Sequence, residues 1–347
     1  MSHRCLAAVL VVIAVVALTP LFAAAQSTEA PRTPWGHPDL QGVWNNGTIT
    51  PMQRPEEQAD KEFLTEEEAA NLEQARIARN ERLLRREARR TTATESVDRG
   101  EDGAPGFYNN LWLDYGTTTT GRTSIVIDPP NGRLPALTPE AQTRRASPEA
   151  QRLRDVGGGR SPAASWEDLP LAVRCIWYRG IPSLPSGYNN HYHIVQTPEW
   201  VAILQEHIHE VRYIPLDGRP HIAPAIRQYA GDSRGHWEGE TLVVETTNFR
   251  NKTIIRQVTG GTGDLSEALH VVERYTRIGP DTLDWEFTVT DPKTWTSPWT
   301  GSLPMTRTQA PMFEYACHEG NYGLYNILTG SRDTEKAAEE AATQASR

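Results

Sequence analysis

The stretch that decides the fold runs from Tyr188 to Phe249 and reads YNNHYHIVQTPEWVAILQEHIHEVRYIPLDGRPHIAPAIRQYAGDSRGHWEGETLVVETTNF. Apolar and polar residues alternate along much of it, which is typical of β-strands with one buried face. Pro198-Glu199 and Glu238-Gly239 interrupt this pattern as short turn signals, and strands joined by such turns pair antiparallel. The stretch therefore predicts antiparallel hairpins, one of them containing a long strand from Trp200 to Leu216.

Further strand patterns occupy residues 122–128, 269–278, 283–290 and 299–307. They raise the expected total to about nine or ten strands, and so many closely spaced strands usually close into a barrel or pack as a sandwich. Gly42-Val43-Trp44 resembles the start of the first strand of lipocalins, in which the Trp closes one end of the barrel. We expect a mainly β protein, either an antiparallel, lipocalin-like β-barrel or a sandwich, with one long N-terminal surface helix.

That helix is predicted over residues 65–90. Thr65 and Glu68 have the spacing of a capping box, acidic residues fill the first turn and arginines fill the last turns, so the charges complement the helix dipole. Residues 137–166 mix Pro, Gly and charged residues without a periodic apolar face, which predicts a loop excursion over the barrel mouth. Residues 335–347 form a polar tail, expected to be a frayed helix or disordered.

The N-terminus has the pattern of a secretory signal peptide: a positive start, an apolar run to Phe22 and Ala23-Ala24-Ala25 before Gln26. We expect residues 1–25 to be removed, which leaves a single β-rich domain over residues 26–334. This domain would be periplasmic or secreted; an uncleaved membrane anchor is the alternative.

The chain has 35 Lys and Arg against 44 Asp and Glu, a formal charge of −9. This balance gives no electrostatic basis for binding nucleic acid or anionic lipid, so neither nucleic acid nor, after cleavage, a membrane is an expected partner.

Two cysteines, Cys175 and Cys317, lie outside the signal segment. In an oxidising compartment they are expected to form a disulfide, which would close a loop of about 140 residues and stabilise the fold by about 4 to 5 kcal/mol on the chain-entropy model. Two buried free thiols are one alternative. Adjacent metal ligands, Cys317 and His318, are another.

Most histidines lie in the stretch that decides the fold, namely His191, His193, His207, His209, His221 and His236. A tight turn at Pro198-Glu199 would bring the first four together, and four imidazoles bind zinc or a similar metal. The His-x-His pairs lack a carboxylate at a matching spacing, however, so we expect no metal and no other cofactor. A His-rich, metal-dependent enzyme stays open as an alternative.

Six motifs make the chain similar to a family of exported bacterial proteins. They are PDLQGVW (38–44), YNN (188–190), LDGRPH (216–221), GDSRGHWEGETLVVETTNF (231–249), DPKTWTSPW (291–299) and YACHEGNY (315–322). The resemblance covers nearly all of the mature chain but brings no assigned reaction and no catalytic residues. Members of the family often have Arg at the position of His236 and residues other than His at the positions of His191 and His193, which weighs against these three as indispensable ligands.

The expected functional residues are therefore His209, Arg212, His221, Asp232 and His318. Asp232 lies between Gly231 and Gly235, in a loop where its carboxylate could orient Arg234 or a histidine for general acid–base catalysis; a plain Asx turn is the alternative. His209 and Arg212 would fall on opposite faces of a regular strand, so they can share a cavity with His221 and Asp232 only if the strand bends near Glu210.

Two classes of function follow from these residues. One is an enzyme that acts on a small organic molecule by cofactor-free acid–base chemistry, in a hydrolysis, elimination or isomerisation. The other is a protein that binds such a molecule without converting it. Motifs of the common serine hydrolases, P-loop and Rossmann proteins and zinc proteases are absent from the sequence.

Overall fold

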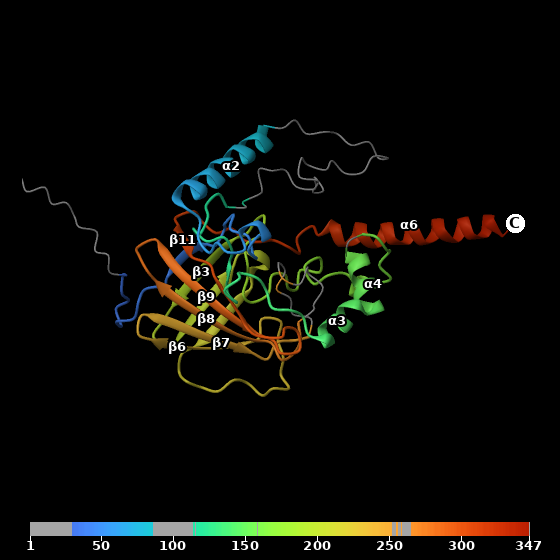
Figure 1. Cartoon of the computed structure of the whole chain (residues 1–347). Coiled ribbons are helices and arrows are strands. Elements are labelled where there is room, and N and C mark those ends of the chain that lie inside the picture. The colour runs from blue at the N-terminus through green and yellow to red at the C-terminus, as the bar shows by residue number, and fades with distance from the viewer. Residues whose placement is uncertain are drawn as a thin grey trace, which may run out of the picture.

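The computed structural model describes residues 30–85, 114, 116–157, 159–251, 255, 258 and 265–346, and one antiparallel sheet of 11 strands dominates them (Figure 1). The strands are β1 (Gly42–Asn45), β2 (Val126–Asp128), β3 (His191–Gln196), β4 (Trp200–Gln205), β5 (Val211–Pro215), β6 (Asp232–Glu238), β7 (Thr241–Thr247), β8 (His270–Arg277), β9 (Thr282–Thr290), β10 (Trp299–Ser302) and β11 (Met305–Thr308). The helices are α2 (Glu66–Arg85), α3 (Pro139–Ala146), α4 (Pro148–Gly157) and α6 (Tyr322–Ala345), with short 3-10 turns η1 (Glu56–Gln58), η3 (Trp166–Asp168) and η4 (His207–His209). The prediction of a mainly β, antiparallel protein is confirmed.

The strands follow the order β5-β4-β3-β1-β11-β9-β8-β7-β6, while β10 pairs with β9 and β2. Most neighbours in this order also follow one another along the chain, and β1 joins the two runs because it pairs with both β3 and β11. The ladder is interrupted between β5 and β6, which lie next to each other without pairing. We call this interruption the seam; because of it the sheet is not closed, and the prediction of a closed, lipocalin-like barrel is wrong.

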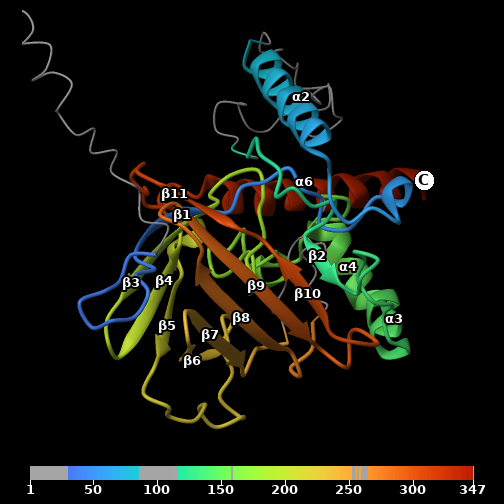
Figure 2. The same ribbon diagram turned by 60° about the vertical axis from the view of Figure 1, so that its left-hand side comes forward.

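Side chains fill the seam where a ladder would otherwise lie. Gly235 of β6 is so close to β5 that a Cβ atom on it would lie 2.8 Å from Ile214 Cγ2 and 2.7 Å from Leu216 Cδ2. Figure 2 shows the curvature of the sheet, which brings β5 and β6 to the same side of the molecule. Packing between facing parts of the sheet is compatible with the predicted sandwich alternative.

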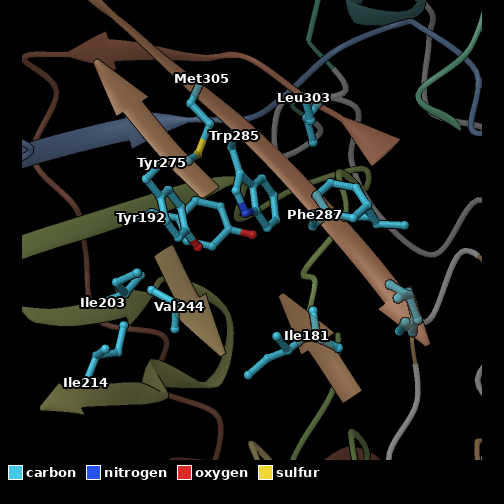
Figure 3. Close-up of a cluster of buried hydrophobic side chains, with 14 of the residues drawn as sticks. Ile181, Tyr192, Ile203, Ile214, Val244, Tyr275, Trp285, Phe287, Leu303 and Met305 are labelled. Carbon is cyan, nitrogen blue, oxygen red and sulfur yellow. The ribbon is translucent and has the colours of Figure 1, made fainter. Parts of the chain in front are cut away.

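The space enclosed by the curved sheet is filled by large side chains. Alternate residues of β8 and β9 are buried, as the sequence pattern requires, and they place Tyr275, Trp285 and Phe287 in the interior. Trp285 stacks on Tyr275 at 6.0 Å and reaches Tyr192 of β3 at 6.1 Å (Figure 3). Trp44 of the Gly-x-Trp motif is fully buried and lies under the Arg277 guanidinium, 5.4 Å from the ring centre.

The helices differ from the prediction in three respects. Helix α2 begins directly after Thr65, and both backbone hydrogen bonds of the predicted Thr65–Glu68 capping box are present, but residues 86–90 lie outside the described residues. The longest described helix is α6 at the C-terminus, which includes most of the expected tail and projects from the body in Figure 1, so the N-terminal helix α2 is not the one long helix of the chain as expected. Residues 137–166, predicted as a loop excursion, contain α3 and α4, with Thr138 capping α3.

The predicted long strand from Trp200 to Leu216 is two strands. Strands β4 and β5 pair antiparallel, with Ile203 opposite Arg212, and η4 turns the chain between them. Ile208 in this turn has a φ of 61°, an unfavourable conformation for a β-branched residue. Residues 205–210 of the turn region read QEHIHE and contain neither Gly nor Pro, which is why the sequence alone predicted one strand.

The predicted disulfide between Cys175 and Cys317 is present and links residues 142 positions apart. Such a bond fits a protein of an oxidising compartment. The expected signal peptide, residues 1–25, lies outside the described part of the chain. Among the described helices, none has the length and apolar composition needed to cross a membrane.

Candidate functional site

Three of the polar side chains near the seam form a connected group, which we call the Asp232 cluster: His221, Asp232 and Arg234. His221 Nδ1 lies 2.8 Å from Asp232 Oδ2, and Arg234 Nη1 donates to Asp232 Oδ1 over 2.8 Å. Asp232 Oδ2 also accepts from the backbone N–H of Ile222 over 3.1 Å. The structure therefore brings together two of the five predicted residues, His221 and Asp232, and Asp232 contacts both a histidine and Arg234.

The backbone at Gly231 explains how Asp232 is presented. Gly231 has a φ of +68°, and a Cβ atom on it would lie 2.5 Å from the Thr247 carbonyl oxygen, so only glycine fits this entry to β6. Ser233, two positions after Gly231, points into the interior, where its hydroxyl is hydrogen-bonded to that of Thr246. Asp232 and Arg234 flank Ser233 and therefore point to the outer face, where the connection from β5 passes over them.

The second ring nitrogen of His221 is the reactive feature of the cluster. Because Asp232 Oδ2 is an acceptor, it fixes the proton of a neutral His221 ring on Nδ1 and leaves a lone pair on Nε2. Among the described residues Nε2 has no hydrogen-bond partner, and it is shielded from solvent although a quarter of the side chain is exposed. An imidazole held by a carboxylate with its other nitrogen unoccupied is the arrangement of a general base.

Arg212 does not belong to this cluster. Its guanidinium lies in the interior and donates to both carboxylate oxygens of Glu273 and, over 3.0 Å, to the Tyr275 hydroxyl. Burial lowers the pKa of Arg212, but Glu273 and Tyr275 raise it by more, so its pKa lies above the ordinary value. Burial and the nearby Glu273 carboxylate raise the pKa of Tyr275 well above its usual range.

The expectation that His209, Arg212, His221 and Asp232 line one cavity is therefore not met for Arg212. Glu273, its partner, shares the interior face with Val271, which lies opposite Thr246, whereas Asp232 points outward. The side chain of His209 lies outside the described residues. His318 is exposed and follows Cys317, and no contact of the described residues links it to Asp232.

A second group, which the sequence analysis did not select, lies where β3 begins and β4 ends. His191 Nδ1 is 2.8 Å from Glu206 Oε2, and its Nε2 is 3.0 Å from the Asn45 amide nitrogen. The hydrogen bond that His191 donates to Glu206 raises the pKa of His191, against the opposing effect of burial. Burial raises the pKa of Glu206, but its bonds with His191 lower it by more. Glu206 directly follows the end of β4, across the hairpin from His191. This position was the sequence signal from which their contact could have been predicted.

Two of the four histidines of the metal-site alternative, His191 and His207, have separate environments. His191 pairs with Glu206, while the His207 ring is stacked 4.2 Å from Tyr178 and 4.5 Å from Tyr315. In the described part of the chain, no three His, Cys, Asp or Glu side chains are grouped as metal ligands. A surface depression near α3, lined in part by Leu137 and Trp295, contains none of the predicted site residues.

Comparison of the chain with protein-family models, with curated proteins and with solved structures found no match. The function has to be inferred from the geometry of the side chains themselves.

Proposed function

We propose that this is a periplasmic or secreted enzyme that acts on a small organic molecule by cofactor-free acid–base chemistry at the Asp232 cluster. The observation that supports this proposal is the 2.8 Å contact from His221 Nδ1 to Asp232 Oδ2, with Nε2 left unoccupied. The disulfide and the signal-like N-terminus support the location. Hydrolysis, elimination and isomerisation all begin with the proton transfer that such a histidine can perform.

In this proposal His221 Nε2 accepts a proton from the substrate or from a water molecule. The ring then carries a proton on each nitrogen, and the Asp232 carboxylate stabilises the resulting positive charge. Arg234 holds Asp232 in place by donating to Oδ1. His221 returns the proton to the product or the leaving group, so the cluster ends the cycle as it began.

The alternative function, binding without conversion, also has an observation in its favour. The Asn248 amide donates to the carbonyl oxygens of Ile222, Ala223 and Ile226, so the same connection that carries His221 is anchored at several points. Asp232 contributes to this anchoring through the Ile222 N–H. In a binding protein, the Asp232 cluster would only shape this loop.

Replacement of His221 by Gln separates the two functions. His236 provides a matched control. It also contacts a carboxylate, that of Glu238, but its side chain is 60% exposed and lies on β6, away from His221. We expect the purified protein to accelerate the cleavage of p-nitrophenyl esters or the elimination of 5-nitrobenzisoxazole, and H221Q to lower this rate by about 10²- to 10⁴-fold. H236Q should keep the wild-type rate. If H221Q and wild type act at the same rate on both probes, the catalytic proposal fails and the binding function is favoured.

A further inference from the structure

Four arginines are buried in the described part of the chain: Arg54, Arg179, Arg212 and Arg277. Only Arg212 forms an ion pair there, with Glu273. A buried charge without an opposite charge is costly, because the protein interior solvates it poorly. Each of the other three therefore needs a physical explanation.

Arg277 is explained by its hydrogen bonds. Its Nε, Nη1 and Nη2 donate to the carbonyl oxygens of Gly279, Asp39 and Pro280, respectively, so every guanidinium nitrogen has an acceptor. Arg54 donates through Nη1 to the carbonyl oxygens of Ala59 and Pro130, while its Nε–H, like that of Arg179, has no acceptor among the described residues. These two arginines fasten loops to the sheet.

Arg179 is the most deeply buried of the three, with 2% of its surface exposed. Nη1 donates to Asn190 Oδ1 over 3.0 Å, and Nη2 donates to Ser186 Oγ over 2.6 Å and to the Tyr188 carbonyl oxygen. All three acceptors are neutral. The Nε–H is shielded from solvent and has no acceptor among the described residues.

The surroundings of Arg179 leave its charge largely uncompensated. Burial lowers its pKa, and the groups that act against this are three tyrosines and Glu206. Tyrosine hydroxyls are neutral near pH 7, and Glu206 is already hydrogen-bonded to His191. The acceptors Ser186 and Tyr188 belong to a half-buried stretch, residues 185–189, that lies over the buried pair of Arg179 and Asn190.

We propose that Arg179 is the binding group for a small oxyanion, a carboxylate or a phosphate, at a site separate from the Asp232 cluster. The anion accepts a hydrogen bond from the Nε–H. It also replaces Ser186 and the Tyr188 carbonyl oxygen as the acceptor of Nη2. A planar guanidinium holds such an anion through two parallel hydrogen bonds, which are charge-assisted and stronger than bonds to neutral acceptors. Stretch 185–189 has to shift to admit the ligand, and Asn189, with a φ of 55°, is the strained position within it.

Thermal melting with added anions tests the proposal. The purified protein is titrated with sodium phosphate and, separately, sodium acetate, each against sodium chloride at the same ionic strength. We expect a saturable rise in Tm with one or both oxyanions, and their relative midpoints distinguish a phosphate from a carboxylate site. Arg179→Lys should weaken the apparent affinity by about tenfold, because Lys keeps the charge but loses the planar fork. R277K is the matched control and should respond as wild type does.

Glu206→Gln provides a second arm that does not disturb Arg179 itself. It removes the carboxylate that competes for the guanidinium charge, so the affinity for the oxyanion should rise several-fold. H221Q should leave the response unchanged, which separates this site from the proposed catalytic one. The absence of a saturable response in wild type, equal losses in R179K and R277K, or an unchanged affinity in E206Q would each overturn the proposal.

Discussion

Arg212 and Glu273 form the most deeply buried ion pair of the described residues, with 6% and 1% of their side-chain surfaces exposed. Tyr275 completes the group, since its hydroxyl donates to Glu273 Oε1 over 2.7 Å and accepts from Arg212 Nη2. The three residues come from β5 and β8, which face each other across the interior. The group therefore links parts of the sheet that are distant in the strand order.

Removal of one member of this pair should destabilise the protein more than removal of both. Glu273→Gln leaves the Arg212 charge buried without a partner, and we expect it to lower the free energy of unfolding by about 3 to 5 kcal/mol. Replacing both residues by Met should recover most of that loss, because two apolar side chains need no partner. Urea unfolding of the single and double variants measures both values. A loss in the double variant equal to the sum of the two single losses would show that the two residues are not coupled.

At the scale of residues, the sequence predicted the partners that are close along the chain better than those that are distant. His221 and Asp232 are 11 positions apart, and the glycines around Asp232 indicated a loop in which they could meet. The pairing of Arg212 with Glu273 spans 61 positions and depends on how the sheet curves, which no local pattern encodes. The contact between His191 and Glu206 depended on where β4 ends.

At the scale of elements, the turn η4 accounts for the main error in the strand assignment. Residues 205–210 read QEHIHE, with Ile208 as the one apolar residue, and no Gly or Pro is present to mark the turn. Tertiary packing holds Ile208, which is 5% exposed, in its unfavourable conformation. The hairpins at Pro198-Glu199 and Glu238-Gly239 carried ordinary turn residues and were predicted correctly.

The seam makes a prediction about Gly235, whose lack of a side chain lets β6 approach β5. We expect Gly235→Val to force Ile214 and Leu216 aside and to lower the free energy of unfolding by about 1 to 3 kcal/mol. Gly279→Ala is the control, because nothing lies within 4 Å of a Cβ atom at that position. Urea unfolding compares the two variants. If G235V has the same free energy of unfolding as G279A, then β5 and β6 can move apart without loss of stability, and their side chains are not closely packed at the seam.

At the scale of the whole molecule, the sequence predicted an antiparallel sheet of many strands but not its interruption. Strand patterns report which face of each strand is buried, and all strands of this sheet bury one face in the same way. They do not report whether the two outermost strands pair. The side chains that fill the seam, such as Ile214, have the same apolar character as those within the ladder.

The disulfide and the seam together predict how the chain behaves when it is cut. A protease site inserted after Gly218, in the exposed part of the connection between β5 and β6, separates Cys175 from Cys317 along the chain. The cut protein should migrate as one species without reductant and as two fragments with it. Since the cut breaks no strand pairing, its Tm under oxidising conditions should stay within a few degrees of the uncut protein. Separation of the fragments without reductant would show that the disulfide is absent.

The position of β1 has a consequence for how the molecule is assembled. Because β1 pairs with β11, the N-terminal and C-terminal parts of the sheet meet at its centre, while its outer strands, β5 and β6, come from the middle of the chain. Each half of the chain, residues 30–216 and 231–346, thus supplies a continuous block of the main strand order. The ladder between β1 and β11 joins the two blocks at the centre, and the shorter ladder between β2 and β10 joins the halves off this path. Such a chain divides naturally into two complementary fragments, which could be produced separately and recombined to regenerate the sheet.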